Sequence, residues 1–84
     1  MELSEEFILE LTQVQQRLFG FLFKRLADRE QAREVLQRTN LVLCRKAENY
    51  EPGTNFKDWA MTVDNYEVMA YRKKSGARAL VRQY

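Results

Sequence analysis

The feature that most constrains this chain is a long apolar stripe near its N-terminus. Apolar side chains recur there at spacings of three and four residues, at Phe7, Leu11, Val14, Leu18 and Leu22. This spacing predicts an α-helix. Ser4 is a suitable N-cap, and Glu5 and Glu6 suit the positive end of a helix dipole. We therefore expect a first helix over residues 5–27.

The width of the stripe predicts a bundle rather than a single helix. Further apolar residues broaden it, namely Ile8, Phe19, Phe23 and Leu26. So wide an apolar face needs more than one packing partner. Gly20 lies in the middle of this helix at some cost to stability, so we expect another helix to approach closely there.

A second helix is expected over residues 28–48. Asp28 followed by Gln31 resembles a capping box, although serine or threonine is the usual first member. The inner face of this helix is predicted to consist of Ala32, Val35, Leu36, Thr39, Val42 and Leu43. Cys44, near the end of the helix, is interpreted as a packing residue, because the negative end of a helix dipole disfavours a thiolate.

A third helix is expected over residues 56–74. The Pro52-Gly53 pair predicts a turn in the segment 49–55, and Thr54 or Asn55 is a suitable cap for the following helix. The predicted buried residues are Phe56, Trp59, Ala60, Val63, Ala70 and Tyr71. Ser75-Gly76 predicts the helix end, because glycine accepts the left-handed conformation found there. Residues 75–84 are then a short basic tail.

The residue types present argue against an enzyme. The chain has no histidine, one cysteine and three scattered glycines, so neither a histidine-based catalytic group nor a glycine-rich phosphate loop is available. We therefore expect no metal and no cofactor. Asp64 and Glu67 lie one helical turn apart and are interpreted as ordinary surface acids. No segment approaches the roughly 20 apolar residues of a membrane span.

Charge is unevenly distributed along the chain. The formal net charge is only +2. However, the segment from Arg72 to Tyr84 carries Lys73, Lys74, Arg78 and Arg82 as further basic residues and has no acidic residue. Such a basic end is either a phosphate-binding surface or a solvated tail.

Three segments resemble a known protein family. They are AREVLQRTNLVLCRK, NYEPGTNFKDWA and NYEVMAYRKK. In this order and at these spacings they resemble region 2 of the extracytoplasmic-function (ECF) sigma factors of bacterial RNA polymerase, from about Phe7 to Lys74. The resemblance implies that residues 1–84 form one all-α three-helix bundle of the sigma region 2 type. The helix-turn-helix region 4 of such factors has no counterpart here, so we expect a truncated form.

The resemblance implies that the second helix docks on a coiled coil of the polymerase's largest subunit. The positions that match the docking surface are Arg33, Glu34, Gln37, Arg38 and Leu41. Glu34 and Gln37 match residues that make polar contacts, and Leu41 adds apolar support. The chain departs from the family at Arg33 and Arg38, where acids are usual. Two arginines in place of two acids reverse much of the local electrostatic field, and electrostatic complementarity governs docking rate and partner choice.

The resemblance also implies that residues 49–55 and the third helix melt the promoter and capture non-template bases of its minus-ten element. The candidate DNA-binding residues are Tyr50, Asn55, Lys57, Met61, Thr62, Asn65, Tyr66, Met69, Lys73 and Lys74. Tyr50 either stacks on an extruded base or packs the loop onto the core. Tyr66 either faces DNA or packs on the first helix. Thr62 and Asn65 replace cations common in the family, which weakens salt-dependent binding, and Asp64 replaces a small apolar residue.

Three hypotheses of function follow. The first is a non-enzymatic transcription initiation domain of the bacterial cytoplasm, whose partners are core RNA polymerase and the non-template strand of promoter DNA. An anti-sigma factor is a further candidate partner, and no membrane partner is expected. The second is a sigma-like protein-interaction module without promoter binding. The third is a helical DNA-binding domain that places a recognition helix in the major groove and prefers duplex DNA.

Overall fold

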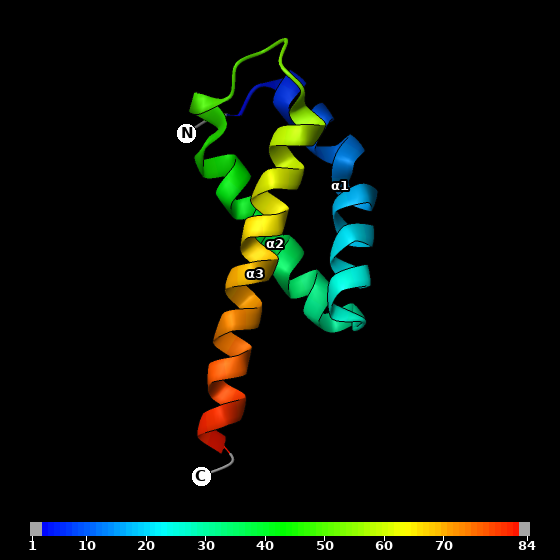
Figure 1. The fold of residues 1–84 in the computed structure, drawn as a ribbon. Helices are drawn as coiled ribbons and strands as arrows, with labels where there is room; N and C mark the ends of the chain where they lie inside the picture. Colours follow the sequence, from blue (N-terminus) through cyan, green and yellow to red (C-terminus); the bar gives the residue numbers. More distant parts are fainter. Residues whose placement is uncertain (1–2, 83–84) are drawn as a thin grey trace.

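The computed structural model describes the backbone of residues 3–82 and the side chains of residues 3–74. Within this range the chain forms four helical elements: α1 (Glu5–Leu26), α2 (Arg29–Arg45), the short 3-10 helix η1 (Ala47–Asn49) and α3 (Phe56–Arg82). In Figure 1, α2 runs back diagonally from the end of α1, and α3 packs across both before its second half projects beyond them. The predicted all-α three-helix fold is confirmed.

The N-terminus of each α-helix is capped by a side chain. Each cap accepts a hydrogen bond from the backbone N–H three residues on: Ser4 from Phe7 (3.1 Å), Asp28 from Gln31 (2.9 Å) and Asn55 from Asp58 (3.1 Å). These bonds satisfy N–H groups that have no partner inside the helix. The predicted caps at Ser4 and Asp28 are confirmed, and Asn55 rather than Thr54 caps α3.

Helix α1 ends at an alanine, Ala27, in a conformation for which glycine is the usual residue. Ala27 adopts the left-handed conformation, with φ of 54°, and its N–H donates to the Phe23 carbonyl at 2.8 Å. This geometry is a common helix end, but glycine usually provides it. The Arg72 guanidinium of α3 donates to the Arg25 carbonyl and thereby satisfies another group at the end of α1.

The end of α3 differs from the prediction. The stop expected at Ser75-Gly76 is wrong, because α3 continues to Arg82. A glycine inside a helix costs only about 1 kcal/mol relative to alanine, and Ala77, Arg78, Ala79 and Leu80 are good helix formers. The side chains of Arg78 and Arg82, which contribute to the predicted basic end, lie outside the described side chains.

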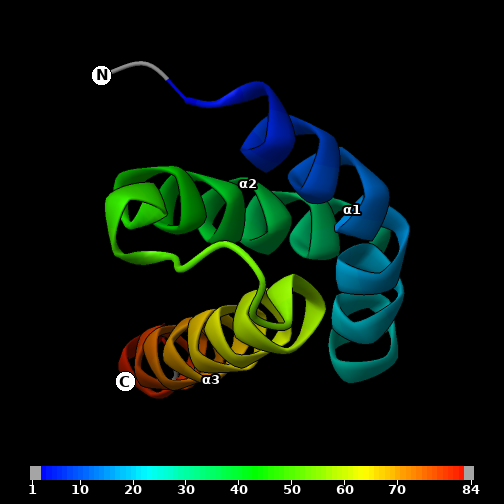
Figure 2. The ribbon, with the colours of Figure 1, turned by 90° about the horizontal axis from the view of Figure 1, so that it is seen from above.

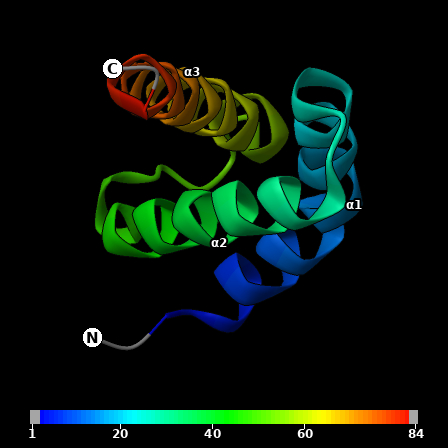
Figure 3. The ribbon, with the colours of Figure 1, turned by 90° about the horizontal axis from the view of Figure 1, so that it is seen from below.

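Two buried clusters lie between the helices. The first comprises Phe7, Val14, Leu18, Leu43, Phe56 and Ala60. The second comprises Leu22, Ala32, Val35 and Val68. Figures 2 and 3 show, from the two ends, how the three helices surround this core. Gln15 of α1 and Asn40 of α2 add a polar link, since their side-chain amides exchange two hydrogen bonds of 2.9 Å.

Three expectations about packing are wrong. Gly20 is exposed, and a Cβ built there meets no atom within 4 Å, so no helix approaches it. Ile8 is 49% exposed and Phe23 is 39% exposed, so the buried face of α1 is narrower than predicted. Ala70 is exposed because it lies on the outward side of α3, whereas Val68, which was not predicted as core, is fully buried.

The described helices include none that is both long and apolar enough to cross a membrane.

Candidate docking face and nucleic-acid interface

The five candidate docking residues lie on the outer side of α2. The opposite side of this helix is buried through Ala32, Val35, Thr39 and Leu43. Arg33, Glu34, Gln37 and Leu41 are exposed, and Arg38 is half-buried. Leu41 is 56% exposed, which places one large apolar side chain among polar neighbours. We name Arg33, Glu34, Gln37, Arg38 and Leu41 the docking face.

Arg38 has two neighbours that moderate its charge. Its guanidinium lies 3.3 Å from the Glu34 carboxylate, one helical turn earlier. It also lies 5.9 Å from the centre of the Tyr71 ring on α3. An exposed ion pair of this kind contributes about 0–1 kcal/mol to stability. The pair nevertheless offsets the arginine's charge, so Arg33 is the less compensated of the two departures from the family pattern.

The outer side of α3 carries most of the candidate DNA-binding residues. Thr62, Tyr66, Met69, Lys73 and Lys74 are exposed, and Asn65 is half-buried. The Asn65 side chain lies 3.7 Å from the Met69 sulfur. The opposite side of α3 is buried through Phe56, Ala60, Asp64 and Val68. We name Thr62, Asn65, Tyr66, Met69, Lys73 and Lys74 the α3 outer face.

Tyr66 and Met61, both predicted to face DNA, differ in their exposure to solvent. Tyr66 is 70% exposed, so the alternative in which its ring packs on α1 is wrong. Met61 is half-buried and packs at the edge of the first core cluster, at the side of α3 that faces α1. Lys57 is exposed near the start of α3, on the same side as Met61.

Tyr50 belongs to an aromatic cluster rather than to an open loop surface. Its ring centre lies 5.1 Å from those of Phe56 and Trp59 and 6.3 Å from that of Phe7. Its hydroxyl lies 3.3 Å from the Glu10 carboxylate and 3.1 Å from the Thr54 carbonyl. Of the two roles open to Tyr50, the structure therefore shows the loop packed onto the core. Asn55 caps α3 and is exposed.

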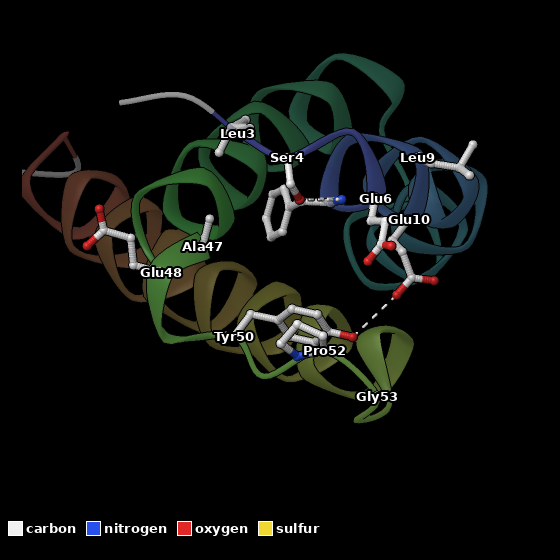
Figure 4. A pocket seen from close by; sticks show the side chains of 11 residues that line it. Leu3, Ser4, Glu6, Leu9, Glu10, Ala47, Glu48, Tyr50, Pro52 and Gly53 are labelled. Carbon is white, nitrogen blue, oxygen red and sulfur yellow. Dashed lines mark hydrogen bonds between the residues drawn. The ribbon is translucent and has the colours of Figure 1, made fainter.

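A cavity of about 450 Å³ lies between the first two turns of α1, η1 and the loop formed by residues 49–55. It is lined by Leu3, Ser4, Glu6, Phe7, Leu9, Glu10, Ala47, Glu48, Tyr50, Pro52 and Gly53. Figure 4 shows Tyr50 and Pro52 at one wall and Glu10 approaching the Tyr50 hydroxyl. Gly53 has φ of 92°, a left-handed conformation that glycine adopts without strain. The cavity combines an apolar floor with three carboxylates, from Glu6, Glu10 and Glu48.

The interpretation of Asp64 as a surface acid is wrong. The residue is fully buried on α3. Its Oδ1 lies 2.9 Å from the hydroxyl of Thr39 on α2, and its Oδ2 has no hydrogen-bond partner among the described residues. Burial raises its pKa from 3.8 to about 7, although the hydrogen bond with Thr39 lowers it. The carboxyl is therefore largely uncharged below neutral pH.

Comparison with known families decides the identity of this arrangement. The family model for sigma-70 region 2 matches residues 11–78. The chain belongs to the sigma-70 region 2 family. Neither the curated proteins nor the solved structures gave a significant match.

Sigma-70 region 2 domains are non-enzymatic parts of transcription initiation factors, which bind RNA polymerase and take part in promoter melting. In this region 2 domain the buried Thr39–Asp64 pair was missed, although a signal was present. Ala60, Asp64 and Val68 are spaced four residues apart, which places all three on one side of a helix. Thr39, by contrast, was correctly predicted to face inward.

Proposed function

We propose that the chain is an ECF-type region 2 domain with two binding surfaces. The docking face on α2 binds the coiled coil of the polymerase's largest subunit. The loop 49–55 and the α3 outer face capture the non-template strand of the promoter minus-ten element. The domain performs no chemistry: promoter opening is driven by its preference for melted strands over duplex. We place this activity in the bacterial cytoplasm, where the polymerase acts.

One observation carries the proposal. Helices α2 and α3 each bury one side and expose the other. The exposed sides carry the residues that match the positions used by the family for polymerase docking and for strand capture. On α2 these are Gln37 and Leu41, and on α3 they are Tyr66 and Met69. A monomer gains nothing in stability from exposing large apolar side chains such as Leu41, Tyr66 and Met69, so such side chains suit a partner surface.

Strand capture is supported both by an exposed aromatic ring on α3 and by the cavity beside the loop 49–55. Single-stranded bases are held by stacking on aromatic rings, worth about 1–3 kcal/mol per base. Tyr66 offers such a ring in the conformation seen here. The 450 Å³ cavity behind Tyr50 has room for an extruded base. Its carboxylates can accept hydrogen bonds from the amino group of a base, although they repel phosphate.

Docking is tested by binding to a purified largest-subunit fragment that carries the coiled coil. We expect saturable binding that Gln37→Ala weakens, since this side chain is exposed on the docking face. Gln13→Ala is the matched control, because Gln13 is exposed on α1. Arg38→Glu shows whether the partner matches the arginine: weaker binding means that it does. If the folded chain does not bind the fragment at high micromolar concentration, the docking proposal is wrong.

Strand capture is tested separately with labelled oligonucleotides. We expect the complex of chain and core polymerase to bind the single non-template strand of a minus-ten element more tightly than the corresponding duplex. Tighter binding to the duplex would instead support the recognition-helix hypothesis.

The hypothesis of a protein-interaction module without promoter binding loses one of its three supporting observations. Thr62 and Asn65 lie on the α3 outer face at positions where cations are common in the family, so these two observations still support it. Asp64 does not weaken the surface, because it is buried behind it. Polymerase binding without sequence-selective single-strand binding would support this alternative.

A further inference from the structure

A second cavity lies beside the α3 outer face. It has a volume of about 590 Å³ and is lined by Arg17, Gly20, Phe21, Lys24, Lys57, Asp58 and Met61. The first four residues belong to α1 and the last three to the first two turns of α3. We name this cavity the α1–α3 groove. Its size is that of a site for small ligands or single nucleotides.

The groove is positively charged. Arg17, Lys24 and Lys57 face it together with one acid, Asp58. All three cations are exposed. The Glu34–Arg38 pair is the only ion pair found among residues 3–74, so the groove cations have no carboxylate partner within that range. The start of α3 also directs the positive end of its helix dipole towards this region.

Apolar groups lie between these charges. Phe21 lines the groove, and the Arg25 guanidinium lies 4.6 Å from the centre of its ring. Met61 forms part of the opposite wall. Gly20 leaves the α1 backbone bare, because no atom lies within 4 Å of a Cβ built there. Cations alternating with aromatic and apolar groups along an open channel are typical of surfaces that hold a single nucleic-acid strand.

The groove is continuous with the proposed capture surface. Met61 and Lys57 are candidate DNA-binding residues and also line the groove. Met61 lies one helical turn before Asn65, which belongs to the α3 outer face, so the two side chains are neighbours on the helix surface. A strand lying on that face can therefore pass over Met61 into the groove without leaving the protein surface.

We propose that the α1–α3 groove holds the sugar–phosphate backbone of the captured strand, with Arg17 and Lys24 as phosphate-binding residues on α1. This inference rests on the proposed strand-capture function and extends it to a helix that the sequence did not implicate in DNA binding. It also provides cations that Thr62 and Asn65 lack on the α3 outer face.

The test measures how binding depends on salt. The probe is a fluorescent single-stranded oligodeoxythymidylate of about 12 nucleotides, titrated with the 84-residue chain at low and increasing salt. The groove variant is Arg17→Glu with Lys24→Glu. The matched control is Arg29→Glu with Lys46→Glu, which makes the same change in net charge at exposed positions outside the groove. Circular dichroism checks that each variant is folded.

Each phosphate contact with a single strand contributes about 0.7 to the slope of log affinity against log salt. We expect the groove variant to reduce this slope by about 1.4 and the control to leave it nearly unchanged. Equal slopes in the two variants overturn the proposal. So does an absence of wild-type binding at low salt, a result that leaves docking on the coiled coil untouched.

A steric pair tests the groove without changing charge. Gly20→Leu places a bulky side chain in the groove, whereas Gln13→Leu places one at an exposed position of α1 outside it. We expect Gly20→Leu to bind the oligonucleotide about tenfold more weakly and Gln13→Leu to bind like the wild type. If Gly20→Leu binds normally while Tyr66→Ala weakens binding, the strand lies on the α3 outer face alone and the groove proposal is wrong.

Discussion

Thr39 on α2 and Asp64 on α3 share a buried 2.9 Å hydrogen bond between the helix with the docking face and the helix with the α3 outer face. The Thr39 hydroxyl also lies 3.0 Å from the Val35 carbonyl. Because a hydroxyl has one hydrogen, the Asp64 carboxyl and the Val35 carbonyl compete for it as acceptors. Thr39 therefore offsets only part of the cost of burying a charged Asp64, whose pKa stays raised by burial.

The first prediction concerns pH and stability. The pKa of Asp64 is about 7 in the folded chain, against 3.8 ordinarily. Its favourable contribution is therefore complete below pH 3.8 and is lost progressively as pH rises to about 7. The loss is about 4 kcal/mol, at about 1.36 kcal/mol per pKa unit. Urea unfolding followed by circular dichroism should show the wild type more stable at pH 5 than at pH 8 by about 3 kcal/mol, because part of the loss has already occurred below pH 5.

Asp64→Asn should remove most of this pH dependence, because the amide does not ionise. Glu67→Gln is the matched control, since Glu67 lies one turn away on the same helix and is only half-buried. If Asp64→Asn retains the full difference between the two pH values, the dependence arises from another group.

The second prediction concerns the end of α1. Ala27 adopts a left-handed conformation, with φ of 54°, which costs an L-residue about 1–2 kcal/mol. Ala27→Gly removes this strain but increases the entropy of the unfolded chain. We expect a net gain of about 0.5–1 kcal/mol in the free energy of unfolding. Ala70→Gly, on the exposed side of α3, should lower stability instead by about 1 kcal/mol. If Ala27→Gly lowers stability as Ala70→Gly does, the left-handed conformation of Ala27 does not strain the native chain.

The third prediction separates the ring of Tyr50 from its hydroxyl. Tyr50→Phe keeps the aromatic packing and loses the contacts with Glu10 and Thr54, so we expect a loss of about 1 kcal/mol. Tyr50→Ala also removes the ring from between Phe56 and Trp59, so we expect a loss of about 3 kcal/mol. Thermal unfolding would measure both losses. Equal stability of the two variants would mean that the ring contributes nothing to the cluster.

The fourth prediction separates binding from folding on α3. Tyr66→Ala and Met69→Ala change exposed side chains, so each should alter stability by less than about 0.5 kcal/mol while weakening single-strand binding. Val68→Ala, on the buried side of the same helix, should cost about 2 kcal/mol. Unfolding and oligonucleotide titration on the same three variants make the comparison. A strongly destabilised Tyr66→Ala would show that its ring supports the fold.

The helices were predictable because periodicity and caps act locally. Ser4 and Asp28 cap their helices as expected. The four-residue spacing of Val14, Leu18 and Leu22 marks the buried side of α1. Such signals depend only on neighbouring residues. The separate exposure of Gln37 and Tyr66 follows from the same periodicity, once the buried side of each helix is known.

The errors arose where tertiary contacts decide. Asp64 is an acid, a residue type usually found at the surface. Its spacing from Ala60 and Val68 indicated the buried side of α3, but the partner that accommodates it there, Thr39, lies on another helix. Gly20 faces a groove rather than a helix, a distinction that depends on how α1 and α3 cross. The α3 helix passes Gly76 because a weak local stop is outweighed by the helix formers on either side. Whether the docking face and the α3 outer face bind their proposed partners stays a prediction.

The packing of Tyr50 has a consequence for how selective the loop is towards nucleotides. In the conformation seen here the ring is already occupied by Phe56 and Trp59 and held by Glu10. Under the proposed strand capture, a base stacks on this ring only after it has swung outward, so the apparent affinity is reduced by the fraction of molecules in which it has done so. The packed ring would then disfavour bases that stack weakly and make the loop selective for the strand it admits.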